Sequence, residues 1–239
     1  MGIVLVHGGA FAGSCWDLML PHLSTPAVAV DLPGRGSRPA DVSTVTLDDF
    51  ATAVATDIDA SGWDRVLLVG HSLAGVTLPR VAGLRADVLA GVVFVSCTVP
   101  AQGQTCLEAL DPGVQDDIDD RLEDPSDSAP IDQDFVRRRF GNDLDEDQFA
   151  WMAGHMLGEE AYGVLNEPCD LRGLTDAVPR FWVHLTQDAI VMPAKQDQGI
   201  ANIGGAEVIP LDAGHMAMVG KPVELAGILD DLAARVGAR

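Results

Sequence analysis

The sequence predicts an α/β fold in which a mostly parallel sheet of about six strands carries helices on both of its faces. Short runs rich in Val, Leu and Ile recur along the 239 residues, and they are continuous rather than alternating. Continuous apolar runs are typical of parallel strands that helices cover on both sides. Between these runs lie segments of helical character with short connections that contain Gly or Pro, as in a doubly wound sheet.

The expected strands cover residues 3–6, 27–30, 66–69, 91–95, 181–185 and 207–209. A helix is expected over residues 47–60, because Thr46 is a suitable N-cap and Asp49 follows it three residues later. A second helix is expected over residues 222–236, where Pro222 takes the first helical position. In such a sheet, ligands bind at the carboxyl ends of the strands.

The strand and helix alternation stops after residue 95 and resumes near residue 180. Acidic residues and three prolines crowd residues 111–134, and residues 135–163 have a helical pattern. A connection of this length is too long for a plain loop. We therefore expect one domain with a core formed by residues 1–98 and 179–239, and an inserted helical cap formed by residues 99–178, called the inserted segment below. Four of its side chains either line a pocket or pack an ordinary helical face: Trp151, Met152, Met156 and Leu157.

Composition excludes several classes of partner. Against 15 Lys and Arg the chain has 36 Asp and Glu, a net charge of −21, which repels nucleic acid and anionic membrane surfaces. The four cysteines show no C-x-x-C spacing, and we expect buried free thiols.

The first apolar run has only the length of a strand, so a cytoplasmic location is expected. The sequence leaves open whether the protein is a monomer or a homodimer.

The strongest local signal is the segment VLLVGHSLAGV at residues 66–76. It reads as an apolar strand, a G-x-S-x-[GA] turn and a helix, and Gly70 and Ala74 are the small residues that a sharp reversal at Ser72 requires. This arrangement predicts Ser72 as a nucleophile. The alternative is an ordinary strand-to-helix turn in which Ser72 only caps the helix.

A serine nucleophile needs a base and a carboxylate that orients the base. His215 lies between the last expected strand and the last expected helix, so its loop falls at the carboxyl end of the sheet. Asp188 follows the preceding strand and completes the order Ser, Asp, His. Asp212, three residues before His215, is the rival carboxylate.

Hydrolysis also needs amide donors for the oxyanion. The amide of Leu73 directly follows the nucleophile, and Gly9 in the loop after the first strand is our choice for the second donor. The alternative is that Gly8 and Gly9 only permit a tight turn between the first strand and the segment that follows it. The same loop lacks the G-x-G-x-x-G spacing of a dinucleotide site, and we expect no cofactor and no metal.

Five segments resemble the hydroxynitrile lyase and plant methylesterase branch of the α/β-hydrolases and its bacterial esterase-like relatives. They are VLVHGGAFAGSCW (residues 4–16), DLPGRG (31–36), LLVGHSLAGV (67–76), TQDAIVMP (186–193) and DAGHMAMVGKP (212–222). The resemblance implies the α/β-hydrolase fold, Ser72, Asp188 and His215 as a catalytic triad, and Gly9 and Leu73 as the oxyanion hole. It also implies a helical cap that shapes an apolar pocket.

Departures from the lyases favour an esterase. Hydroxynitrile lyases carry a lysine after the catalytic histidine and a threonine after the histidine of the first loop, whereas this chain has Met216 and Gly8. We expect hydrolysis of a small or medium-sized apolar carboxylic ester, such as a methyl ester, through an acyl-enzyme. A lyase, a cyclase or a carbon–carbon hydrolase on the same scaffold is the first alternative, and a ligand receptor without turnover is the second.

Overall fold

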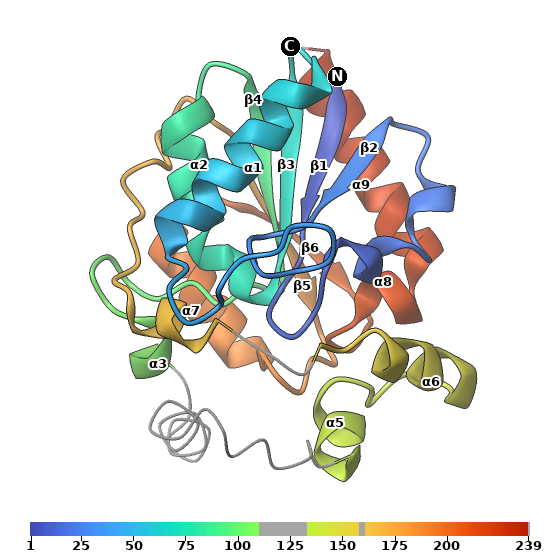
Figure 1. Cartoon of the computed structure of the whole chain (residues 1–239). Helices are drawn as coiled ribbons and strands as arrows, with labels where there is room; N and C mark the ends of the chain where they lie inside the picture. Colours follow the sequence, from blue (N-terminus) through green and yellow to red (C-terminus); the bar gives the residue numbers. More distant parts are fainter. Residues whose placement is uncertain (110–132, 158–160, 239) are drawn as a thin grey trace.

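The computed structural model describes residues 1–109, 133–157 and 161–238, and its centre is one parallel sheet of six strands (Figure 1). The strand order is β2-β1-β3-β4-β5-β6. The strands are β1 (Gly2–Val6), β2 (Ala27–Val30), β3 (Val66–His71), β4 (Leu89–Val95), β5 (Arg180–Leu185) and β6 (Glu207–Leu211). Every expected strand is present, which confirms the predicted fold class.

The order of the strands determines where a site can form. β1 lies between β2 and β3, with Val6 opposite both Val30 and Gly70. After β2 the chain therefore crosses to the other side of β1 before it enters β3. The carboxyl ends of β1 and β3 meet at this switch point, which is the usual position of a ligand site in an open α/β sheet.

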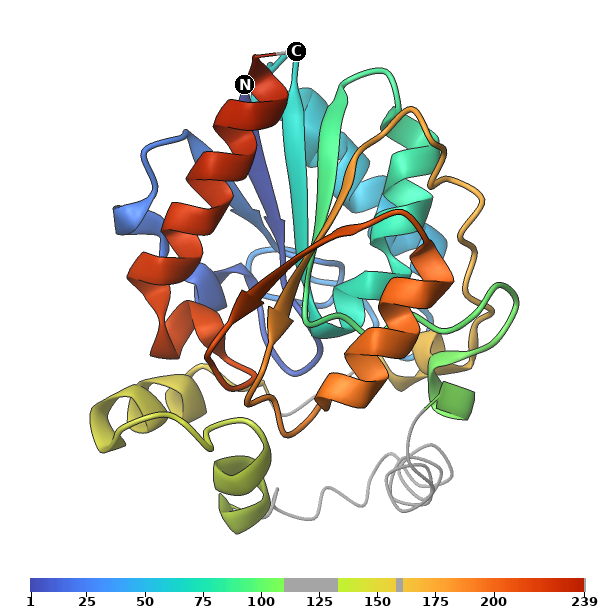
Figure 2. The same cartoon turned by 180° about the vertical axis from the view of Figure 1, so that it is seen from behind.

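Helices cover both faces of the sheet. Alternate residues of β1 belong to different clusters: Val4 and Val6 pack with α1 (Leu47–Ser61) and α2 (Leu78–Arg85), whereas Ile3 and Leu5 pack with α9 (Pro222–Gly237). Figure 1 shows α1 and α2 in front of the sheet, and Figure 2 shows α9 on the opposite face. The remaining core elements are η1 (Gly13–Trp16), η2 (Leu20–His22), η3 (Ser72–Val76), α7 (Pro193–Ile203) and α8 (Ala217–Gly220).

The helix boundaries follow from the expected capping residues. The Thr46 side chain accepts a hydrogen bond from the amide of Asp49, and the Asp49 side chain accepts one from the amide of Thr46. Such a cap contributes about 1 kcal/mol. α1 ends where Gly62 takes a left-handed conformation with φ 67°.

Helices α5 (Gln133–Arg139) and α6 (Glu146–Gly154) of the inserted segment lie beyond the carboxyl ends of the strands (Figures 1 and 2). The other described elements of this segment are α3 (Cys106–Ala109) and η4 (Tyr162–Asn166). The expected helical stretch over residues 135–163 is therefore wrong in part, because α5 and α6 are separate helices joined by a loop. Most of the acidic stretch at 111–134 lies outside the described residues. The division of the chain into core and cap stays a prediction.

The four cysteines are buried and form no disulfide, as expected. Among the residues that the structure describes, no helix has the length and apolar character needed to cross a bilayer.

Candidate active site

The predicted nucleophile lies at the switch point of the sheet, directly after β3. Ser72 has φ 53°, in the left-handed region that side chains with a Cβ rarely adopt. In the described part of the chain two other non-glycine residues share this conformation, Ala10 with φ 61° and Ser96 with φ 42°. All three follow the carboxyl end of a strand. Backbone strain of this kind concentrates at functional sites.

Close packing explains the small residues around Ser72. A Cβ atom at Gly70 would lie 2.9 Å from the Cβ of Ala74 and 2.8 Å from Leu78, so the turn can close only with glycine at position 70. Ala74 is buried in place of the glycine that this turn usually has. The helix that we expected directly after Ser72 begins instead as the 3-10 turn η3 and becomes α2 at Leu78.

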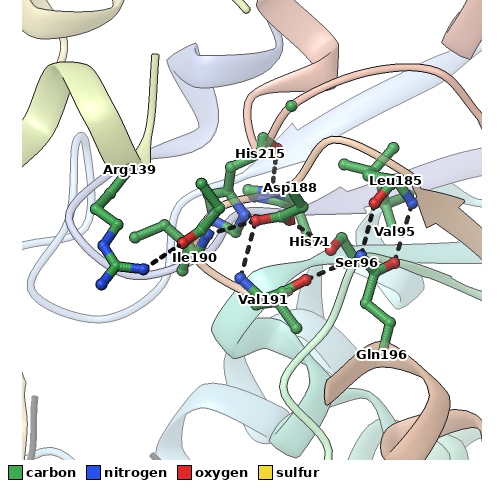
Figure 3. A network of polar contacts seen from close by, with 12 residues as sticks. His71, Val95, Ser96, Arg139, Leu185, Asp188, Ile190, Val191, Gln196 and His215 are labelled. Atoms are coloured by element: carbon green, nitrogen blue, oxygen red, sulfur yellow. Dashed lines mark hydrogen bonds and ion pairs between the residues drawn. The ribbon is translucent and has the colours of Figure 1, made fainter. Parts of the chain in front are cut away.

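The predicted base and carboxylate contact each other. The distance from His215 Nδ1 to Asp188 Oδ2 is 2.7 Å, and both residues are buried (Figure 3). Asp212 is exposed and accepts hydrogen bonds from Thr186 and Gln187 instead. Of the two candidate carboxylates, only Asp188 pairs with His215.

The environment of Asp188 keeps its carboxylate ionised. Oδ2 also accepts a hydrogen bond of 2.6 Å from the hydroxyl of Ser96, and Oδ1 accepts from the amides of Ile190 and Val191 at 2.7 and 2.8 Å (Figure 3). Burial alone would raise the pKa of Asp188, but the charge of His215 and the hydrogen bonds lower it below its usual range. Asp188 therefore only accepts hydrogen bonds, so His215 Nδ1 carries the proton and Nε2 is left as the basic atom.

A second histidine connects Ser72 to His215. His71 Nε2 lies 2.9 Å from the carbonyl oxygen of His215, and the two ring centroids are 4.5 Å apart. Burial, followed by the nearby His215, lowers the pKa of His71 to about 3. His71 is therefore neutral at ordinary pH and donates a hydrogen bond from Nε2 to that carbonyl. On its other side, a Cβ atom at Gly8 would lie 3.3 Å from His71 Nδ1 and 2.8 Å from the Cβ of Ser72.

The two predicted oxyanion donors line one small cavity beside Ser72. Gly9 and Leu73 both border it, and among the described residues neither amide donates a hydrogen bond to another group. His7 fixes the Gly8–Gly9 peptide, because its Nδ1 lies 2.8 Å from the oxygen of Gly8 and its Nε2 accepts from the amide of Leu32. In a trans peptide the N–H points away from the C=O. The hydrogen bond from His7 thus directs the Gly9 N–H to the opposite side.

Comparison with known proteins gives the family. The model of the alpha/beta hydrolase family matches residues 3–228. The chain belongs to this family.

Its relatives include bacterial and plant hydrolases. A pyrethroid hydrolase from Sphingobium wenxiniae is 25% identical, covering 97% of this chain and 87% of the relative. Methylesterase 17 from Arabidopsis thaliana is 24% identical, covering 98% of this chain and 92% of the relative. The fold also matches an extracellular alpha/beta-hydrolase from a Paenibacillus species with a TM-score of 0.87 and 19% identity, covering 97% of this chain and 98% of that one. The predicted resemblance is confirmed.

The inserted segment of this alpha/beta hydrolase contacts both halves of the site. The amide of Leu157, after α6, donates a 2.8 Å hydrogen bond to the carbonyl of Ala10 in the loop that carries Gly9. The Asp143 carboxylate, between α5 and α6, accepts a 2.6 Å hydrogen bond from the amide of Gly214, next to His215. A Cβ atom at Gly214 would lie 2.3 Å from Asp143 Oδ1, so a larger residue there would displace the carboxylate from this position.

Three supporting residues were missed by sequence reasoning. Ser96 is the first residue after β4, and its position at the same sheet edge as Ser72 was a usable signal. Gln196 on α7 is fully buried and bonds the backbone of Leu185 and Val191, which holds the loop of Asp188 (Figure 3). No local sequence pattern pointed to Asp143, because its partner Gly214 is remote in the sequence.

Three of the four side chains of the inserted segment that sequence reasoning left open pack against the core. Met152 is buried in the core, and Trp151 and Met156 pack against it.

Proposed function

We propose that this protein is a serine esterase that hydrolyses a small or medium-sized carboxylic ester through an acyl-enzyme. The observation that carries the proposal is the buried 2.7 Å contact between His215 Nδ1 and Asp188. The pair lies at the same edge of the sheet as Ser72, whose backbone is strained at the end of β3. A structural serine needs neither a buried imidazole–carboxylate pair nor two free amides.

In the first half-reaction Ser72 Oγ attacks the ester carbonyl, and its proton passes to His215 Nε2. Asp188 keeps the Nδ1 proton in place and stabilises the imidazolium that forms. The amides of Gly9 and Leu73 donate to the oxygen that becomes negatively charged. When the tetrahedral intermediate collapses, the carbon–oxygen bond breaks and His215 returns its proton to the leaving alcohol.

In the second half-reaction water replaces the alcohol. His215 takes a proton from the water, the resulting hydroxide attacks the acyl carbon, and the proton then passes to Ser72 Oγ as the acid leaves. The sum is one ester and one water converted to one acid and one alcohol.

The relatives and Met216 support ester hydrolysis over lyase chemistry. Proteins named methylesterase and pyrethroid hydrolase align with nearly the whole chain, so a methyl ester is a reasonable substrate class to test. Met216, directly after His215, is fully buried and uncharged. It offers no cation to a departing cyanide ion.

Two measurements on matched variants test the proposal. Wild type, Ser72→Ala and the control Ser43→Ala are treated with a fluorophosphonate probe and with p-nitrophenyl acetate; Ser43 is exposed and lies before α1. We expect Ser72→Ala to lose labelling and to lose at least about 10⁴-fold in kcat. The control retains both.

The source of the oxygen in the product separates hydrolysis from the alternatives. Wild-type turnover in ¹⁸O-labelled water must place one labelled oxygen in the acid. Equal labelling of wild type and Ser72→Ala, or a product without added water, would reject the proposal.

A further inference from the structure

A cavity of about 260 Å³ adjoins the candidate active site. It is bordered by Thr98, whose amide donates a 3.0 Å hydrogen bond to the carbonyl of Ser72. It is also bordered by Ile190 and Val191, whose amides hold Asp188. The cavity therefore shares a wall with the segments that hold Ser72 and Asp188. Its volume is slightly below the roughly 300–1,000 Å³ of ordinary ligand pockets, so it suits a short substrate.

The cavity has an apolar wall and a cationic side chain. Phe135, Ile190 and Val191 provide apolar surface, and Arg139 enters from the end of α5. The Arg139 guanidinium donates one hydrogen bond of 2.9 Å, from Nη1 to the carbonyl of Ala189, next to Asp188 (Figure 3). This bond places the guanidinium beside the loop that holds the Asp188 carboxylate.

Arg139 differs from most arginines of this acidic protein. Within the described ranges it forms no ion pair, and its remaining N–H groups have no acceptor among the described residues. Seven other arginines do pair with an Asp or a Glu: Arg38, Arg80, Arg85, Arg137, Arg172, Arg180 and Arg235. With 36 acidic residues in the chain, an arginine at a cavity wall that has no ion pair among the described residues is the exception.

Two other charged side chains border the cavity, and the wall is less acidic than the protein as a whole. Lys195 on α7 also borders it and donates a 3.0 Å hydrogen bond to the carbonyl of Ala109. Glu108 borders it too and accepts a hydrogen bond from the amide of Thr105. The described wall thus carries two cationic groups and one anionic group, in a protein of net charge −21.

We propose that the ester hydrolysed at this site carries a carboxylate remote from the scissile bond, and that Arg139 binds this carboxylate. This inference rests on the esterase function proposed above. A guanidinium presents a planar pair of N–H donors that matches a carboxylate, and such charged hydrogen bonds are the stronger ones. The apolar side chains then contact the carbon chain between the two groups.

The test compares charged and neutral esters with the same number of carbon atoms. With the charge in the acyl part, the pair is the mono-p-nitrophenyl ester of glutaric acid and p-nitrophenyl valerate. With the charge in the alcohol part, the pair is acetylated γ-hydroxybutyrate and butyl acetate. The measured quantity is the ratio of kcat/KM for the charged ester to kcat/KM for the neutral one.

We expect wild type to favour the charged ester in at least one pair, and Arg139→Gln to lower that ratio by about 10- to 100-fold. Arg139→Lys retains the charge without the planar pair of N–H donors, and its ratio should lie between those of wild type and Arg139→Gln. The matched control is Arg138→Gln, which removes the same charge from an exposed neighbour on α5 that does not border the cavity. Its ratio should equal that of wild type.

A measurement on wild type alone removes any dependence on folding of the variants. Glutarate should inhibit the hydrolysis of p-nitrophenyl valerate more strongly than the neutral glutaramide does. Equal inhibition by glutarate and glutaramide would overturn the inference. So would a ratio of kcat/KM values that Arg139→Gln leaves unchanged in both pairs. Ser72-dependent hydrolysis of the neutral ester would in either case still support the esterase function. Equal losses on both members of a pair would show that Arg139 only braces the loop of Asp188. Absence of Ser72-dependent hydrolysis would remove both proposals.

Discussion

His7 offers a direct test of the oxyanion geometry, because each ring nitrogen holds a different backbone group. Its Nδ1 donates to the oxygen of Gly8 and its Nε2 accepts from the amide of Leu32. The side-chain nitrogen of His7→Asn can take the place of Nδ1, whereas the side-chain oxygen of His7→Gln can take the place of Nε2. We expect only His7→Gln to release the Gly8–Gly9 peptide.

The expected size of the effect follows from the hydrogen bond that is lost. Losing it and leaving a buried carbonyl without a donor costs about 1–3 kcal/mol. If that free energy shifts the peptide away from the orientation that presents the Gly9 amide, kcat falls by roughly 5- to 160-fold, at about 1.36 kcal/mol per factor of ten. The complete loss of one oxyanion donor sets the ceiling, at about 10²–10³-fold.

The assay is the steady-state hydrolysis of p-nitrophenyl valerate by wild type, His7→Asn and His7→Gln, with the unfolding free energy of each measured in urea. His7→Gln should lower kcat and kcat/KM together, since the oxyanion forms only in the transition state. His7→Asn should keep most of kcat but lose stability, because the Leu32 amide loses its acceptor. A His7→Gln enzyme with wild-type kcat, or equal kcat losses in both variants, would refute the reasoning.

Three further predictions concern the neighbours of the reacting groups. Ser96→Ala removes one of the two donors to Asp188 Oδ2, so kcat should fall by about tenfold while KM changes little, as steady-state kinetics would show. Gly8→Ala would place a Cβ atom 2.8 Å from the Cβ of Ser72, so a folded variant should lose about 10²-fold or more in kcat, and full activity would contradict the close packing at this turn. The folded-state pKa of Asp188 is lowered, so its ionisation stabilises the native state above the unfolded pKa of about 3.9, and this contribution is lost as pH falls through the folded-state value. The difference in unfolding free energy between wild type and Asp188→Asn should therefore be constant near neutral pH and shrink in acid, and a difference that does not change with pH would disprove this account.

The sheet and the chain order of Ser72, Asp188 and His215 could be predicted because their signals are local. A buried strand, a small-residue turn and a polar residue after a strand are each readable within about ten residues. The sheet then brings the ends of β3, β5 and β6 to one edge, whatever the loops do between them.

The supporting contacts could not be predicted, because they join segments that are distant in the sequence. Asp143 reaches Gly214 across 71 residues, and Leu157 reaches Ala10 across most of the chain. The break between α5 and α6 has the same cause, since the loop that contains Asp143 leaves the helical path to meet the His215 loop. Propensity alone carries no information about such a partner.

The contacts of the inserted segment have a consequence for engineering. Leu157 holds the loop of Gly9, the oxyanion donor, and Asp143 holds the loop of His215, the base. Arg139 bonds the loop that carries Asp188. Grafting this segment from a relative to change which ester is accepted would also disturb the alignment on which turnover depends. Selectivity and speed should therefore change together in such chimaeras, unless the grafted piece reproduces these three attachments.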